Sequence, residues 1–125
     1  MAVSPEYLIL NSRDELLRID INSIVYFEAD GNYTRIITAN NLKAVVCMNL
    51  ARMLALLNAR LCTTVPTFAR VGKKHIINLT HIYSIHTLKQ QLVLSDGRSF
   101  AYTIPISKEA LKELKHIIIL SNTPA

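Results

Sequence analysis

Short apolar runs separated by turn residues dominate the first part of the chain. Each run is rich in β-branched or aromatic residues and is bounded by Asn, Asp, Ser or Gly, which is typical of short strands. Asp30-Gly31-Asn32 separates two of these runs, and Asp-Gly supplies the positive φ values of a tight hairpin. The pattern predicts a strand pair followed by a three-stranded meander, with strands over residues 7–10, 15–21, 23–29, 33–38 and 42–47.

The hydrophobic period changes after Asn49. Apolar residues now recur at i, i+3, i+4 and i+7, which predicts an amphipathic helix that ends near Asn58 and has Asn49 as its N-cap. We expect this apolar stripe to face the core rather than a partner protein. The stripe consists of Leu50, Met53, Leu54 and Leu57.

Strand-like runs return further along, over residues 81–87, 91–95 and 98–103. Asp96-Gly97 lies between the last two and is the strongest hairpin signal in the chain. Pro105 ends the last strand, and Ser107 can cap a final helix with Ala110, Leu111, Leu114 and Ile118 on its apolar face. The predicted fold class is therefore mostly β, with elongated antiparallel strands and two short helices.

The stretch from Phe68 to Asn78, FARVGKKHIIN, combines cations with apolar anchors. Arg70, Lys73 and Lys74 lie between two apolar pairs that we expect to be buried, so the charges should be presented on a loop. Gly72 permits a positive φ or a close backbone approach. The alternative is an ordinary solvated turn.

Charge is distributed unevenly along the 125 residues. The net charge is +5, and no acid occurs between Asp30 and Asp96, a span that holds eight of the fourteen lysines and arginines. The resulting positive field attracts nucleic acid, an anionic membrane surface or an acidic protein. The longest apolar run, Ile117–Leu120, is far shorter than the roughly 18 residues of a membrane span, and no signal peptide precedes Tyr7. We expect a cytoplasmic protein without membrane contact.

Candidate catalytic or metal-binding residues are sparse. Cys47 and Cys62 have no CxxC spacing, so we predict that both are small core residues. The four histidines form no H-E-x-x-H pattern, and a nucleophile elbow, a P-loop and a G-x-G-x-x-G loop are all missing from the sequence. We therefore predict no enzyme activity, no metal and no cofactor.

Several strings in order resemble the LytTR DNA-binding domain, the output module of many bacterial response regulators. The resemblance covers Tyr7 to Leu120, which leaves residues 1–6 as an N-terminal extension and 121–125 as a C-terminal tail. The strings are IVYFEADGNYTRI (24–36), NLARMLALL (49–57), FARVGKKHIINL (68–79), LSDGR (94–98) and IPISK (104–108).

The resemblance implies projecting loops that enter successive major grooves on one face of double-stranded DNA. It also implies binding to paired direct repeats, with weak homodimer formation on the DNA. The chain has R-V-G-K-K where the family usually has R-V-H-R-S, and S-K where S-R is common, so a guanine contact becomes weaker or becomes a phosphate contact. The implied contact residues are Asn32, Tyr33, Thr34, Arg70, Lys73, Lys74 and Lys108.

Two hypotheses of different classes follow. The first is a sequence-specific DNA-binding transcriptional regulator, either free-standing or one domain of a longer protein. The second is a β-rich interaction module that docks on an acidic signalling partner such as a kinase or a receiver. A small enzyme would require a pocket that joins two of the histidines.

Overall fold

The computed structural model of the chain describes residues 7–60 and 67–121. Most of this part is strand, as the spacing of apolar and turn residues predicts, and the two predicted helices are present. The strands are β1 (Tyr7–Asn11), β2 (Leu16–Asp20), β3 (Ile24–Asp30), β4 (Tyr33–Thr38), β5 (Lys43–Val46), β6 (Phe68–Val71), β7 (His75–Asn78), β8 (Ile82–His86), β9 (Gln91–Ser95) and β10 (Ala101–Pro105), and the helices are α1 (Leu50–Arg60) and α2 (Lys108–Ser121).

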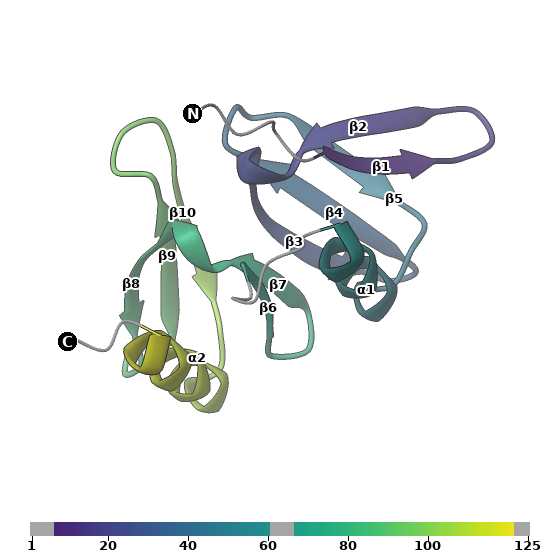
Figure 1. Ribbon diagram of the computed structural model, residues 1–125. Helices are drawn as coiled ribbons and strands as arrows, with labels where there is room; N and C mark the ends of the chain where they lie inside the picture. The colour runs from purple at the N-terminus through teal and green to yellow at the C-terminus, as the bar shows by residue number, and fades with distance from the viewer. Residues whose placement is uncertain (1–6, 61–66, 122–125) are drawn as a thin grey trace.

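Three antiparallel sheets follow one another across the molecule (Figure 1). The central sheet has five strands in the order β5-β4-β3-β7-β6, so the predicted meander is extended by a second hairpin. A two-stranded sheet, β1-β2, lies at one end, and a three-stranded sheet, β10-β9-β8, lies at the other. The predicted class, mostly antiparallel β with two helices, is confirmed.

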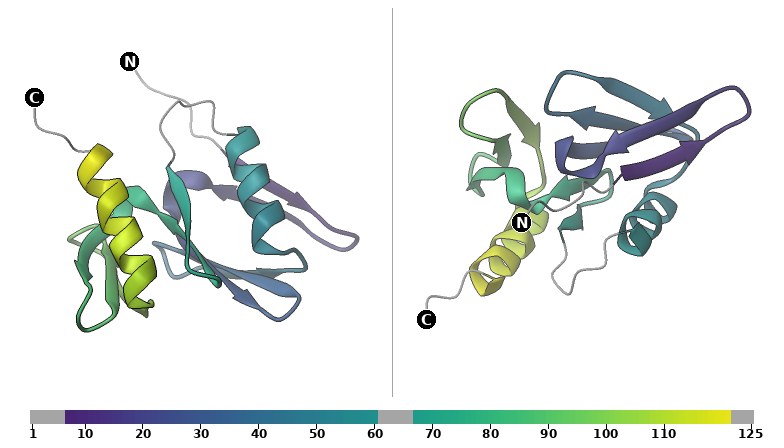
Figure 2. Two further views of the ribbon diagram at one scale, coloured as in Figure 1. Left: turned by 90° about the horizontal axis from the view of Figure 1, so that it is seen from below. Right: turned by 45° about the horizontal axis from the view of Figure 1, so that its top comes forward.

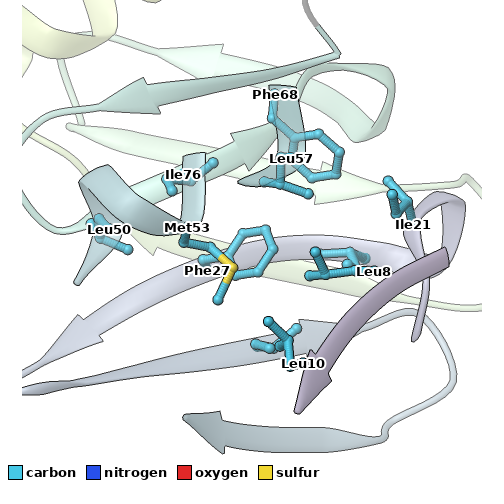
Figure 3. Packing of buried hydrophobic residues seen from close by; sticks show 11 residues of the cluster. Leu8, Leu10, Ile21, Phe27, Leu50, Met53, Leu57, Phe68 and Ile76 are labelled. Carbon is cyan, nitrogen blue, oxygen red and sulfur yellow. The ribbon is translucent and has the colours of Figure 1, made fainter. Parts of the chain in front are cut away.

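One face of the central sheet is covered by α1 and the β1-β2 pair. Figure 3 shows Met53 and Leu57 of α1 beside Phe27 and Phe68, whose ring centroids lie 5.9 Å apart. The predicted apolar stripe of α1 therefore faces the core. The Asn49 side chain accepts a hydrogen bond of 2.8 Å from the Arg52 N–H, which confirms the predicted cap.

The opposite face is covered by α2 and the three-stranded sheet. Leu111 and Leu114 of α2 are buried in a second apolar cluster with Val25 and Ile77 of the central sheet. The Ser107 hydroxyl accepts a hydrogen bond of 3.3 Å from the Ala110 N–H, as predicted for the cap of α2. Two separate cores thus hold the central sheet from both sides.

Two similar corners connect the sheets. Each corner is a short 3₁₀ turn, Ile21–Ser23 or Leu79–His81, that follows a polar residue. The side chain of that residue, Asp20 or Asn78, accepts a hydrogen bond from the backbone N–H two residues later. Asn78 is buried, and its amide also donates to the Ile24 carbonyl at 2.8 Å. His81 Nε2 lies 3.2 Å from the Asn22 carbonyl, so the two corners contact each other.

The β9–β10 loop differs from the tight hairpin predicted at Asp96-Gly97. The second strand begins at Ala101 rather than at residue 98, because the Asp96 carboxylate organises a wider loop. It accepts hydrogen bonds from the Ser99 hydroxyl and from the backbone N–H groups of Arg98, Ser99 and Phe100. These bonds, that of the Ser99 hydroxyl first, hold the pKa of Asp96 well below its usual range.

The prediction of a buried Cys47 is wrong. Cys47 follows the last residue of β5 and is exposed, on the wall of a surface cavity of about 430 Å³ between β1 and β5. A short apolar run shows which residues prefer burial, but not where its strand ends. Cys62 lies outside the described residues.

We predict that Asn78→Ala lowers the free energy of unfolding by about 2 kcal/mol, because the Ile24 carbonyl and the Thr80 N–H lose their buried partner. Urea unfolding followed by circular dichroism measures this change. Asn58→Ala, on the exposed side of α1, is the matched control and should shift stability by less than about 0.5 kcal/mol. Equal losses of unfolding free energy in the two variants would contradict the stabilising role of the Asn78 hydrogen bonds.

Candidate nucleic-acid interface

The predicted cationic stretch forms the β6–β7 hairpin. Arg70 pairs with Ile76 and Val71 with His75, which leaves Gly72-Lys73-Lys74 as the connecting turn. The four apolar anchors are buried, whereas Arg70 and both lysines are exposed. The hydrophobic pattern therefore predicts the presentation of these cations correctly.

The turn is braced from within and stands against α2. The Arg70 guanidinium donates a hydrogen bond of 3.1 Å to the Lys73 carbonyl, which ties the strand to the turn. Gly72 has φ +67°, a backbone conformation that costs residues with a side chain more free energy than glycine. A Cβ at this position would lie 3.8 Å from the Ala110 Cβ. The turn is therefore fixed beside the first turns of α2.

An open depression of about 680 Å³ separates the β6–β7 turn from the start of α2. Arg70, Lys73 and Lys74 line one side, and Glu109 and Glu113 line the other. Within the described ranges, none of the three cations forms an ion pair with an acidic side chain. Their charges remain available to an external anion.

Lys108, on α2, is a further exposed cation close to this depression, although it does not line it. It is exposed and is the first residue of the helix, where its charge adds to the positive end of the helix dipole. It also lacks an ion-pair partner among residues 7–60 and 67–121. An anion bound here would pair with the Lys108 charge and would offset its unfavourable interaction with the helix dipole.

The tip of the β3–β4 hairpin lies next to the same turn. The Ala29 N–H donates to the Lys74 carbonyl at 2.8 Å, so the end of β3 runs beside the start of β7. Asn32 is exposed at the tip, and Tyr33 is 51% exposed. In the left view of Figure 2, the β3–β4 tip, the β6–β7 turn and the start of α2 follow one another along one edge.

Thr34 differs from the other predicted contact residues, because its burial speaks against a contact with DNA. Its side chain is fully buried, and its hydroxyl donates a hydrogen bond of 2.6 Å to the Met48 carbonyl. Successive residues of a strand face opposite sides, so Thr34 points into the core when Tyr33 points outward. Thr34 instead fixes the connection between β5 and α1.

A polar row that the sequence analysis missed lies behind the two turns. Arg35 on β4 forms ion pairs with Asp30 at 2.7 Å and with Glu28 at 3.7 Å. Glu28 also lies 3.1 Å from the buried His75 Nε2 on β7. Glu28 and Asp30, the acids of β3 near the edge, are therefore paired within the sheet, and the row links three strands directly behind the tips. The opposite charges of Glu28 and Arg35 across a predicted hairpin were the available signal.

Tyr26 lies next to this row. Its ring contacts the rings of His75 and Tyr102, at centroid distances of 6.1 Å and 5.7 Å. Burial raises the pKa of Tyr26, and the negative charge of Glu28 raises it further. The Tyr26 hydroxyl therefore stays neutral and adds no negative charge near the edge.

Metal binding and membrane spanning receive no support from the described part of the chain. No three His, Cys, Asp or Glu side chains gather there in a way that could hold a metal ion. Neither of its helices is long and apolar enough to cross a bilayer.

Comparison with known proteins identifies the family. The family model "LytTr DNA-binding domain" matches residues 14–119. The chain belongs to this family. The predicted family is therefore confirmed, and DNA is supported as the partner. The family is a DNA-binding rather than a catalytic one, which supports the prediction that the chain is not an enzyme.

Two curated relatives come from Paraburkholderia xenovorans (strain LB400) and are named heme-containing CO-sensing transcriptional regulators RcoM 2 and RcoM 1. They are 28% and 26% identical to this chain over 106 residues, which is 85% of the chain. The matched region is 37% of each relative's length.

A solved structure shows the same fold. It is the LytTr DNA-binding domain of a putative methyl-accepting/DNA response regulator from Bacillus cereus. The TM-score is 0.65 at 18% identity, over 92% of this chain and 98% of the other.

We predict that Thr34→Val destabilises the LytTr domain by about 1 to 2 kcal/mol, because the Met48 carbonyl loses its hydrogen-bond donor. DNA affinity and its salt dependence should remain those of the wild type, since the side chain faces the core. Chemical unfolding and fluorescence anisotropy measure the two quantities. Thr103→Val, on the exposed side of β10, should change neither. A loss of DNA affinity without a loss of stability would restore Thr34 as a contact residue.

Proposed function

We propose that this chain is a sequence-specific DNA-binding transcriptional regulator whose projecting segments enter successive major grooves on one face of the duplex. The observation that carries the proposal is the grouping of Arg70, Lys73 and Lys74 along one side of an open depression, without ion-pair partners in the described ranges. Lys108 is exposed at the start of α2, whose first turn borders the same depression. Two of its relatives are named transcriptional regulators, which supports the regulatory role.

The proposed contacts divide by chemistry. Lys73, Lys74 and Lys108 are flexible point charges and suit phosphate oxygens. Arg70 braces its own turn through one nitrogen, and its guanidinium has further donors for a phosphate or a guanine edge. At the neighbouring tip, Asn32 can form paired hydrogen bonds with an adenine edge, and Tyr33 offers a hydroxyl and an apolar ring. Sequence preference would come mainly from this tip.

The proposal extends to the assembly on DNA. Residues 7–120 form the DNA-binding domain, and two protomers bind paired direct repeats with weak contact between them. A cytoplasmic location suits this role. The competing function, docking on an acidic signalling protein, would use the same exposed cations. A gel shift on duplex DNA at low salt separates the two functions, because docking on a protein predicts no shifted band.

Selection of bound sequences from a random duplex library is the most direct experiment. Enrichment of a repeated motif would establish sequence-specific binding and would report the site in the same step. Recovery of unselected sequences would contradict the specificity, and failure to retain any duplex at low salt would contradict DNA binding altogether.

We predict that Lys73→Ala and Lys108→Ala each weaken binding and reduce the slope of log K against log salt by about 0.9, the loss expected for one phosphate contact. Their melting temperatures should stay close to that of the wild type, because both side chains are exposed. Anisotropy titrations at several salt concentrations measure the slope.

Lys115→Ala is the matched control for this series, since Lys115 is an exposed lysine of α2 that lies two turns beyond Lys108. It should leave the slope unchanged. Large stability losses in Lys73→Ala and Lys108→Ala would show that these lysines have a structural role, and a wild-type affinity that ignores salt would contradict the proposal.

A further inference from the structure

The exposed turn between β8 and β9 is held by hydrogen bonds within the turn. The Gln90 N–H donates to the Thr87 carbonyl at 3.2 Å, and the Lys89 N–H donates to His86 Nδ1 at 3.2 Å. Gln90 has φ +54°, a left-handed conformation that a residue with a side chain adopts only at a cost. Such strain persists where the surroundings fix the backbone, and it is common at functional sites.

A hydrogen bond attaches this turn to the start of α2. The Ile106 N–H donates to the Gln90 carbonyl at 3.1 Å, and Lys108 follows two residues later. In the left view of Figure 2, the β8–β9 turn lies at the same edge as the start of α2, beyond it when one comes from the β6–β7 turn. The turn therefore continues the row formed by the three proposed contact segments.

The two central residues of the turn are unusual for a solvated turn. Leu88 is 78% exposed, the highest value among the large exposed hydrophobic residues of the described ranges. Lys89 is exposed, and within residues 7–60 and 67–121 it has no ion-pair partner. Turns that only face solvent favour Gly, Asn, Asp, Ser and Pro at such positions. An apolar residue next to a cation suits a surface that is partly apolar and partly anionic.

We infer that the β8–β9 turn is a fourth DNA-contacting segment, in which Lys89 binds a backbone phosphate and Leu88 packs against the methyl group of a thymine in the major groove. The major groove is the place where a duplex presents an apolar group, the thymine 5-methyl, close to phosphates. The inference rests on the proposed DNA-binding function, and it lengthens the footprint on the side of α2 that lies away from the β6–β7 turn.

The phosphate contact is tested by the salt dependence of binding to a duplex selected by the full chain. Lys89→Ala should reduce the slope of log K against log salt by about 0.9. Arg98→Ala is the matched control, because Arg98 is an exposed cation on the β9–β10 loop at the opposite end of the same sheet. It should leave the slope unchanged. Equal slopes for Lys89→Ala and the wild type would overturn the phosphate contact.

The thymine contact is tested by replacing thymine with deoxyuridine, which removes only the 5-methyl group, at each position of the selected site in turn. At one position the wild type should lose roughly fourfold in affinity, the effect of one buried methyl group. Leu88→Ala should bind the two duplexes equally, whereas Leu42→Ala, at another exposed leucine, should keep the wild-type difference. The thymine contact is overturned if no deoxyuridine substitution lowers the affinity of the wild type. It is also overturned if Leu88→Ala keeps the wild-type difference in affinity between the two duplexes.

These experiments distinguish a failure of the fourth contact from a failure of the proposed DNA-binding function. If Lys73→Ala and Lys108→Ala weaken binding while the Lys89 and Leu88 variants behave like their controls, only the fourth contact fails. If none of the four variants changes binding, the proposed DNA-binding edge fails as a whole. Melting temperatures should remain unchanged in all four, because their side chains are exposed.

Discussion

Antiparallel pairing of β3 with β7 is the interaction on which the rest of this structure depends. Three residue pairs and the bond from the Ala29 N–H to the Lys74 carbonyl join two hairpins that are far apart in the sequence. Without it, the β3–β4 tip and the β6–β7 turn would be independent loops. With it, they are neighbouring ends of one sheet, and the row of Arg35, Glu28 and His75 reinforces the link directly behind them.

The two cores give this sheet its second function, which is to orient α2. Leu111 and Leu114 pack on the face opposite α1, and the start of the helix consequently lies beside Gly72. The first turn of the helix and the cations of the hairpin then border one depression, and Lys108 is exposed at the start of the same helix. Burial of apolar groups in this way holds the three cations of the β6–β7 hairpin close together at the surface.

Much of the secondary structure follows from the sequence alone, because it depends on local signals. The period of the stripe in α1, the caps at Asn49 and Ser107 and the glycine turns each act over a few residues. The exposure of the β6–β7 cations was predictable for the same reason, since their apolar neighbours fix which side of each strand is buried.

Features that depend on distant residues were not predictable. Thr34 faces inward because of the register of β4 and the position of Met48. The exposure of Cys47 depends on where β5 ends, and the wide β9–β10 loop depends on several bonds to one carboxylate. The pairing of β3 with β7 has no local signal at all, although it brings the candidate contacts together.

Because one sheet is shared by two cores, the distances between its projecting ends are fixed by buried residues, whereas the chemistry at those ends is carried by exposed ones. Evolution can therefore exchange the side chains at the tips without refolding the domain. Divergent members of such a family would retain the same distances between these ends while the side chains that the ends present change.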